Sequence, residues 1–209
     1  MKIAVFGAGG RVGREVCQIA KTRGHDVVAI EKDTDVKAVD GVDVVIDFST
    51  AEATQKVCEF CLAHHCPLVT GVTGRTQKEQ EILTETEKVV PVKASANFSV
   101  GIQQMYALCK ELGKLGWDVE IVETHRKDKR DSPSGTAKQL ACAIEQNGTR
   151  KVTIHSLRAG SNFGTHEVIF ATAGESLTII HRAENVGIFA LGAIKCAEKL
   201  VKETGTVDN

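Results

Sequence analysis

A short basic segment carries the side chains best suited to chemistry. Residues 123–137 read ETHRKDKRDSPSGTA, and a Gly-Thr pair there opens an expected helix. A helix N-terminus favours carboxylates or phosphates, because its N–H groups are unpaired and its dipole end is positive. The segment therefore predicts a site for a small polyanion, with a histidine and a lysine able to transfer protons. The alternative is a solvated basic loop. The cationic or potentially cationic side chains are His125, Arg126, Lys127, Lys129 and Arg130.

A glycine-rich turn is the second chemical feature. Residues 7–13 read GAGGRVG and follow an apolar strand expected at 2–6. Gly7 would allow a tight turn, Gly10 would let backbone approach a pyrophosphate, and Gly13 would permit close helix packing. The chain lacks the usual G-x-G-x-x-G spacing, because Val12 occupies the position of the last glycine. A glycine run alone is weak evidence for nucleotide binding. The strand before it and the helix after it favour dinucleotide binding, with contacts expected from Gly7, Ala8, Gly9, Gly10, Arg11 and Val12.

The ends of later strands supply further candidates for the same site. Glu31 follows the strand at 26–30, and a carboxylate there would accept hydrogen bonds from ribose hydroxyls. Lys32 suits a 2′-phosphate, so NADH or NADPH is the expected cofactor; the alternative is a solvated lysine. Ligands of parallel sheets lie at the carboxyl ends of strands, so two loops should flank a nicotinamide. These are Gly71, Val72 and Thr73, and Ser95, Ala96, Asn97 and Phe98, unless they are ordinary turns with Asn97 capping a helix.

The order of expected elements predicts an α/β fold in two domains. Strands at 2–6, 26–30, 42–48, 67–70 and 89–94 alternate with helices, which is typical of a Rossmann-like parallel sheet. From residue 99 the helices and strands suit a smaller α+β substrate domain with a mixed open sheet, and the helix at 186–201 should return to the first domain. We predict a dinucleotide-binding domain at 1–97 and 183–209, and a substrate-binding and oligomerisation domain at 98–182. The polar stretch 158–166 is expected to be a flap.

Composition excludes several classes of partner. A net charge of −1 and 4% aromatic residues argue against nucleic acid. No apolar run approaches the ~18 residues of a membrane span, and no secretory segment precedes the first strand, so a cytoplasmic location is expected. Seven cysteines are expected to be reduced thiols. Zinc at Cys58, Cys61, His64, His65 and Cys66 would need a second ligand pair, so no metal is predicted.

The whole chain resembles the dihydrodipicolinate reductase (4-hydroxy-tetrahydrodipicolinate reductase) family of bacterial lysine and diaminopimelate biosynthesis. The resemblance implies NAD(P)H-dependent hydride transfer to the cyclic dicarboxylate 4-hydroxy-tetrahydrodipicolinate, in a homotetramer built through substrate-domain sheets. It also implies hinges near Asn97 and before the last helix. The motifs that carry it are VFGAGGRVGRE at 5–15, VVIDFST at 44–50, TGVTG at 70–74, ANFSVGI at 96–102, DVEIVETHRKDKRDSPSGTA at 118–137, RAGSNFGTHEVIF at 158–170 and HRAENVGIFALGAI at 181–194.

The resemblance also implies roles for residues of the basic segment. His125 matches the family's catalytic acid/base and Lys129 its proton donor, while Gly135 and Thr136 match the pair that holds a substrate carboxylate. Arg126 stands where the family has a second, substrate-binding histidine, and arginine can still bind a carboxylate. Lys127 replaces an arginine, and the family's C-terminal extension is nearly absent. These departures motivate a second hypothesis, a low-activity paralogue that senses NAD(P)H and a dicarboxylate. A third hypothesis is another two-domain dehydrogenase that acts on aspartate or a semialdehyde.

Overall fold

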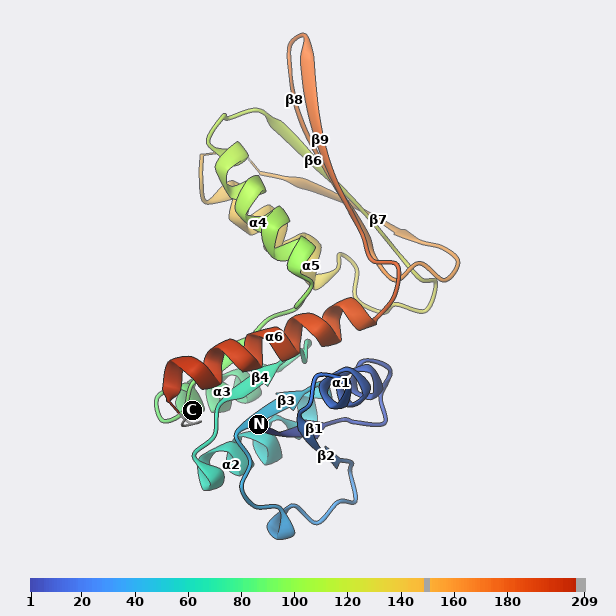
Figure 1. Ribbon diagram of the computed structural model, residues 1–209. Coiled ribbons are helices and arrows are strands. Elements are labelled where there is room, and N and C mark those ends of the chain that lie inside the picture. Colours follow the sequence, from blue (N-terminus) through green and yellow to red (C-terminus); the bar gives the residue numbers. More distant parts are fainter. Residues whose placement is uncertain (149–150, 206–209) are drawn as a thin grey trace. The chain divides into compact units, whose positions relative to one another are not determined.

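The computed structural model describes residues 1–148 and 151–205 and divides into two compact units (Figure 1). The first comprises Met1–Phe98 together with the chain from Val186 onward, and the second is Ser99–Asn185. The predicted boundaries differ from these by one and three residues. Phe98 belongs to the first unit because its ring is buried in that unit's core. Ala183 belongs to the second because its N–H donates to the Gly164 carbonyl at 2.8 Å.

The first unit is built on a five-stranded sheet in which every neighbouring pair is parallel. The strand order is β2-β1-β3-β4-β5, and β1, β3 and β4 are almost wholly buried, as expected for parallel strands covered on both faces. The predicted Rossmann-like α/β fold is confirmed. The strands are β1 (Lys2–Phe6), β2 (Asp26–Ile30), β3 (Val44–Asp47), β4 (Leu68–Thr70) and β5 (Val92–Ala94).

Helices cover both faces of this sheet. On one face α1 (Arg11–Thr22) packs beside α6 (Gly187–Thr204), so the last helix returns to the first unit as predicted (Figure 1). On the other face lie α2 (Thr54–His64) and α3 (Gln77–Glu87). The expected helix at 51–65 starts as a 3₁₀ turn at Ala51–Ala53, preceded along the chain by a second such turn at Val36–Ala38. The helices bury two separate apolar layers against the sheet.

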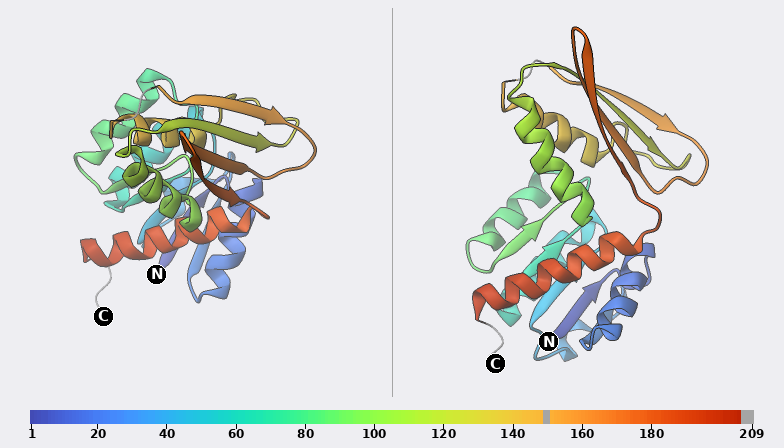
Figure 2. Two further views of the ribbon diagram at one scale, coloured as in Figure 1. Left: turned by 90° about the horizontal axis from the view of Figure 1, so that it is seen from above. Right: turned by 45° about the horizontal axis from the view of Figure 1, so that its top comes forward.

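The second unit contains a mixed four-stranded sheet in the order β7-β6-β8-β9, which confirms the predicted mixed open sheet. The central strand β6 (Asp118–His125) runs parallel to β7 (Thr153–Arg158) and antiparallel to β8 (Thr165–Thr172), and β8 pairs with β9 (Glu175–Arg182). Both helices, α4 (Val100–Gly113) and α5 (Gly135–Glu145), cover the same face of the sheet (Figure 2). Among the described residues of this unit, no helix covers the other face.

Strand β6 positions the residues of the predicted site. It continues two residues beyond its expected end at residue 123, and its inward positions are Val119, Ile121, Glu123 and His125. The first two are apolar and pack under α4 and α5, while the last two place a carboxylate and an imidazole in the interior. Burial of such groups requires hydrogen-bonding partners, and these partners shape the site.

The segment predicted as a flap is shorter than expected. Arg158 ends β7 and Thr165 begins β8, so only residues 159–164 form a loop. Its backbone pairs with the basic segment: the N–H of Arg126 donates to the Asn162 carbonyl at 2.8 Å, and that of Lys127 to the Gly160 carbonyl at 3.2 Å. The loop is therefore hydrogen-bonded to the basic segment in this structure.

Neither a metal-binding cluster nor a membrane-spanning helix occurs among residues 1–148 and 151–205. No group of three or more His, Cys, Asp or Glu side chains is placed to hold an ion, and no helix is both long and apolar enough to cross a bilayer. Cys58, Cys61 and Cys66 are buried in the core between the sheet and α2. They pack there as small apolar side chains.

Candidate functional site

The glycine turn between β1 and α1 is required by the backbone geometry. Gly7 has φ +71°, and a Cβ there would lie 2.8 Å from the backbone nitrogen of Ser49. A Cβ at Gly13 would lie 2.1 Å from the Gly7 carbonyl oxygen, so only glycine allows α1 to pack this closely. Gly10 is the N-cap of α1, no side chain in the described part of the chain caps it, and the first turn holds no acid. The start of α1 thus fits a phosphate group.

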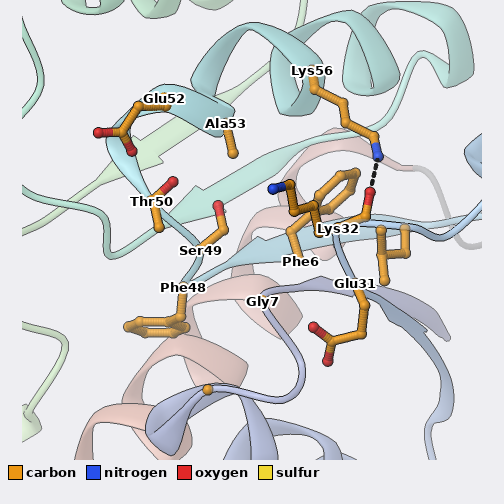
Figure 3. A pocket seen from close by; sticks show the side chains of 12 residues that line it. Phe6, Gly7, Glu31, Lys32, Phe48, Ser49, Thr50, Glu52, Ala53 and Lys56 are labelled. Atoms are coloured by element: carbon orange, nitrogen blue, oxygen red, sulfur yellow. Dashed lines mark hydrogen bonds between the residues drawn. The ribbon is translucent and has the colours of Figure 1, made fainter.

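A cavity of about 540 Å³ lies beside this turn, at the carboxyl ends of β1, β2 and β3 (Figure 3). Of the predicted cofactor residues, Gly7, Gly10, Glu31 and Lys32 line it. Ala8, Gly9, Arg11 and Val12 belong to the same turn or the start of α1 but do not line the cavity. The sequence analysis missed the remaining lining residues, which come from the strand ends and the start of α2: Phe6, Ile30, Phe48, Ser49, Thr50, Glu52, Ala53 and Lys56.

Charged side chains are distributed unevenly around this cavity. The Glu31 carboxylate lies against the glycine turn, since a Cβ on Gly9 would be 2.7 Å from Glu31 Oε1. Lys56 reaches from α2 and its Nζ donates to the Lys32 carbonyl at 3.3 Å (Figure 3). The cavity therefore offers the Glu31 carboxylate at the turn, the Glu52 carboxylate just before α2, and the two ammonium groups of Lys32 and Lys56. That arrangement suits a ribose with a nearby phosphate.

The loop after β4 contains Gly71, Val72 and Thr73 and is held by a buried arginine. Arg75 donates to the Val72 carbonyl at 2.7 Å and to Thr70 Oγ1 at 2.7 Å. Its guanidinium also lies 3.8 Å from Asp47 at the end of β3, and both side chains are buried. Neither Asp47 nor Arg75 was singled out from the sequence, because the ion pair joins the end of β3 to the loop after β4 and only the folded sheet brings them together.

The segment Ser95–Phe98 meets that loop around one aromatic ring. A Cβ on Gly71 would lie 2.2 Å from the Phe48 ring, and the Phe98 ring centroid is 6.2 Å from that of Phe48. Ser95 Oγ both donates to the Asn97 carbonyl and accepts from the Asn97 N–H, which closes a tight turn. The following helix α4 is capped by Ser99, so the alternative of Asn97 as helix cap is wrong.

In the second unit, the inward end of β6 forms a buried cluster around Glu123. This carboxylate is fully buried and hydrogen-bonds His125 Nδ1. Arg158 of β7 binds both its oxygens, at 2.6 and 2.9 Å, and the N–H of Ser134 donates to Oε1 at 3.2 Å. Glu123 therefore joins β6, β7 and the start of α5 immediately beneath the predicted catalytic histidine.

Burial and charge shift the acid–base behaviour of this pair. Burial alone would raise the pKa of Glu123, but the hydrogen bonds from Arg158 and His125 help to lower it to about 2. Burial also lowers the pKa of His125, against the opposing effect of the Glu123 carboxylate. At neutral pH Glu123 is thus ionised, and its carboxylate partly offsets the effect of burial on the pKa of His125.

A second histidine lies behind the first. His166 of β8 stands opposite Glu123 in the sheet, and its ring centroid is 5.1 Å from that of His125. Its Nε2 is 3.2 Å from Ser134 Oγ. The pKa of His166 is lowered to about 3, mainly by burial and also by the neighbouring His125. His166 is therefore a neutral group that packs and hydrogen-bonds within the cluster.

Two of the predicted cations in the basic segment already have carboxylate partners. Lys129 Nζ lies 2.6 Å from Asp131 Oδ1, and Arg126 Nε lies 2.7 Å from Asp128 Oδ1. Burial would raise the pKa of Asp131, but the hydrogen bond from Lys129 outweighs it and the pKa is lowered. A substrate carboxylate would have to compete with these aspartates for the two cations.

The N-terminus of α5 completes the predicted constellation. Ser134 is its N-cap, and its Oγ accepts from the Ala137 N–H at 3.2 Å. Gly135 and Thr136 form the first turn, which contains no acidic residue. This helix start suits a carboxylate. His125, Arg126, Lys129, Gly135 and Thr136 thus all lie on one continuous stretch between the end of β6 and the first turn of α5.

The sequence analysis missed Arg158 and His166, and gave Glu123 no role beyond that of a strand residue. Arg158 and His166 lie far along the chain, and only the strand register of β6 with β7 and β8 brings them to Glu123. One signal was present: continued alternation from Val119 places Glu123 and His125 on the buried side of the strand.

Family models and relatives among known proteins match this chain over nearly its full length. Two family models, "Dihydrodipicolinate reductase, N-terminus" and "Dihydrodipicolinate reductase, C-terminus", match residues 1–98 and 101–208. A 4-hydroxy-tetrahydrodipicolinate reductase of Thermosipho africanus is 38% identical, covering 97% of this chain and 93% of the relative. One of Caldanaerobacter subterraneus subsp. tengcongensis is 35% identical, covering 96% of this chain and 93% of the relative.

The fold likeness extends to solved structures. The dipicolinate-bound dihydrodipicolinate reductase of Paenisporosarcina sp. TG-14 superposes with a TM-score of 0.79 at 20% identity, covering 97% of this chain and 95% of that one. Aspartate semialdehyde dehydrogenase II of Vibrio cholerae shares the fold less closely, with a TM-score of 0.64 and 12% identity over 97% and 98% of the two chains. The names of the curated relatives make this chain an oxidoreductase. Because both family models match and these relatives are more than 30% identical over almost its whole length, the chain belongs to the dihydrodipicolinate reductase family.

Proposed function

We propose that this chain reduces 4-hydroxy-tetrahydrodipicolinate to tetrahydrodipicolinate with NADH or NADPH, as a step of lysine and diaminopimelate biosynthesis. The observation that carries the proposal is the Glu123–His125 pair, which stands at the head of a cationic segment leading into the N-terminus of α5. An acid–base group and a carboxylate-binding helix start on one short stretch suit reduction of a cyclic dicarboxylate. The reductase names of the relatives support the same substrate.

The first unit is the proposed dinucleotide-binding domain. The uncapped start of α1 would receive the pyrophosphate, while Glu31 and Lys32 would contact the adenosine ribose and any phosphate on it. The residues of the loops at 71–73 and 95–98 would flank the nicotinamide. When bound, the reduced cofactor supplies the hydride.

The second unit is the proposed substrate domain. Arg126 and the Gly135–Thr136 helix start would bind the two substrate carboxylates. The relative from Paenisporosarcina is a dipicolinate-bound structure, and dipicolinate is a planar dicarboxylate, which supports this class of ligand. Arginine at position 126 can bind a carboxylate through two parallel hydrogen bonds.

His125 and Lys129 are the proposed catalytic residues. Loss of the 4-hydroxyl group as water gives a conjugated imine, and hydride from the reduced nicotinamide would then add to a ring carbon of that imine. The addition leaves electron density on the ring nitrogen and the α-carbon, and a proton must neutralise it. His125 acts as the acid/base, since its Nδ1 is held by Glu123 and its Nε2 is the nitrogen left to exchange a proton. Lys129 serves as a proton donor and stabilises the developing negative charge.

Assembly into a homotetramer is part of the proposal. The face of the mixed sheet that no helix of this unit covers carries Leu157 and Ile180, which are 52% and 43% exposed. Exposed apolar residues on a sheet face favour contact with another copy of the chain. In analytical ultracentrifugation we expect Ile180→Glu to weaken assembly. Val89→Glu, at an exposed apolar position of the first unit, should leave assembly unchanged, and equal masses for both variants would contradict this assignment.

A coupled assay tests the reaction. Aspartate semialdehyde and pyruvate are condensed by an aldol enzyme to give the substrate, and loss of nicotinamide absorbance is followed after adding this chain with NADH or NADPH. We expect turnover, with a product lighter than the substrate by one oxygen atom in mass spectrometry. The absence of turnover under these conditions would refute the proposed reaction.

A sensor of NAD(P)H and a dicarboxylate is the second candidate. The carboxylate partners of Arg126 and Lys129 favour it, because each cation is already engaged within the protein. Calorimetric titration with dipicolinate and NADH in the same preparation separates the two functions. Tight binding of both ligands without turnover would support the sensor, whereas turnover supports the reductase.

A further inference from the structure

We propose that Glu123, held by Arg158, is the positioning residue for His125: it fixes the ring with Nδ1 protonated and directs Nε2 toward the substrate. This inference rests on the proposed function of His125 and adds two residues to it. It begins from the burial of Glu123, which has no exposed surface yet is ionised. A buried carboxylate is costly unless every lone pair is satisfied, so its partners require explanation.

Each oxygen of the Glu123 carboxylate accepts from Arg158 and from one further group. Oε1 accepts from Arg158 Nη2 at 2.6 Å and from the Ser134 N–H at 3.2 Å. Oε2 accepts from Arg158 Nη1 at 2.9 Å and bonds His125 Nδ1. The arginine therefore grips both oxygens and fixes the carboxylate plane, while one oxygen remains directed at the imidazole.

An ionised carboxylate is an acceptor only, so the nitrogen that faces it must carry the proton. Nδ1 of His125 is thus the N–H, and Nε2 is the nitrogen free to take up or release a proton. Nε2 points past Gly164, where a Cβ would lie 3.0 Å away and φ is +147°. A glycine at this position leaves room next to the reacting nitrogen.

Arg158 affects the protonation of His125 in two opposing ways. It keeps Glu123 ionised, but its own charge disfavours protonation of the nearby imidazole. The other groups facing His125 are Lys129 from the basic segment and His166 from β8. Glu123 therefore raises the pKa of His125 and Arg158 lowers it. Removing Glu123 should lower that pKa, and removing Arg158 should raise it.

The experiment is a histidine titration by NMR with selectively labelled imidazole in Glu123→Gln, Arg158→Met and the wild type. We expect the His125 pKa to fall in Glu123→Gln, since the carboxylate that stabilises the imidazolium is lost. It should rise in Arg158→Met, where a competing cation is lost while the His125 imidazolium and the Ser134 N–H still hold Glu123 ionised. In wild type the nitrogen shifts should report the tautomer with the proton on Nδ1.

Two controls keep this test decisive. Asp118→Asn removes a carboxylate from the other end of the same strand and should leave the His125 titration unchanged. Glu123→Gln leaves the half-buried Arg158 without its counter-charge and could prevent folding. The double variant Glu123→Gln/Arg158→Met removes both charges, and it should titrate between the two single variants.

Turnover provides a second readout. In Glu123→Gln we expect kcat to fall about tenfold or more, with the alkaline limb of its pH profile moved to lower pH and cofactor affinity unchanged. Equal His125 pKa values in all variants, or shifts in the same direction, would overturn the positioning role. The titration needs no turnover, so opposite shifts in an inactive wild type would refute the proposed reductase while leaving the positioning role standing.

Discussion

Arg158 binds both carboxylate oxygens of Glu123, at 2.6 and 2.9 Å, directly beneath His125. Arg158 lies at the end of β7 and Glu123 near the end of β6, so the pair fastens two neighbouring strands where they reach the basic segment. Because the carboxylate also bonds the Ser134 N–H, the same group ties the histidine to the start of α5. The proposed acid/base and the proposed carboxylate site therefore share one rigid support.

Lys32 should discriminate between the two nicotinamide cofactors. It lines the cavity beside the glycine turn, and a lysine there suits a 2′-phosphate. We expect Lys32→Ala to raise the Kd for NADPH about tenfold and to change the Kd for NADH little, because a lost phosphate contact costs about 1.4 kcal/mol. Fluorescence titration of both cofactors checks this. Lys88→Ala, at the C-terminal end of α3 and outside the cavity lining, is the matched control. Equal losses of affinity for NADH and NADPH would contradict the assignment.

Lys56 should act on the same phosphate from the opposite side. It extends from α2 into the cavity and donates to the Lys32 carbonyl (Figure 3). We expect Lys32→Ala/Lys56→Ala to weaken NADPH more than either single change, and Glu31→Ala to weaken NADH, since Glu31 faces the ribose hydroxyls. The same titrations measure both effects. An unchanged NADPH affinity in the double variant would place the phosphate elsewhere.

The Asp47–Arg75 pair should contribute to stability as well as to the loop after β4. Both side chains are buried, and Arg75 also binds Val72 and Thr70. Arg75→Met leaves Asp47 uncompensated, so we expect the free energy of unfolding to fall by about 3–5 kcal/mol. Urea denaturation measures this, and Asp47→Asn/Arg75→Met should recover part of the loss. A double variant less stable than the sum of the two single changes would show that the pair is not the cause.

Acid should destabilise the second unit through His166. Its pKa is about 3 in the folded chain against 6.5 for an ordinary histidine, so as pH falls the unfolded chain takes up this proton first. The free energy of unfolding therefore decreases from about pH 6.5 downward, by at most about 1.4 kcal/mol per pH unit from this group. Glu123, with a folded pKa of about 2, adds a similar loss below about pH 4.5.

The variant His166→Gln isolates the histidine contribution. Glutamine can keep a hydrogen bond to Ser134 Oγ but does not titrate. In urea denaturation between pH 7.5 and 5 we expect the variant to lose stability with a shallower slope than the wild type, whatever its stability at pH 7.5. Parallel slopes for the two proteins would contradict a depressed His166 pKa.

Much of the fold was predictable because short sequence patterns, such as apolar runs and glycine turns, determine its elements. The parallel strands are short apolar runs, and the glycine turn at Gly7 and Gly13 lies where close backbone approach demands glycine. The basic segment was also predictable, since His125, Lys129 and Gly135 lie on one stretch of chain. Strand alternation in β6 held further than expected, to His125.

The parts that escaped prediction depend on distant pairings. Arg158 reaches Glu123 only through the register of β7 on β6, and Arg75 reaches Asp47 only because β3 and β4 are neighbours. Lys56 lines the proposed cofactor cavity because α2 begins near the residues that follow β2. No local pattern encodes such contacts, since each depends on which strands lie side by side.

The central claim is that His125 is the acid/base of a dicarboxylate reductase. The most direct measurement is kcat of wild type and His125→Asn with the aldol product of pyruvate and aspartate semialdehyde, with the cofactor Kd measured in parallel. We expect the wild type to oxidise the cofactor and the variant to lose about tenfold or more in kcat, with its cofactor Kd unchanged. Wild-type turnover in His125→Asn would contradict the account.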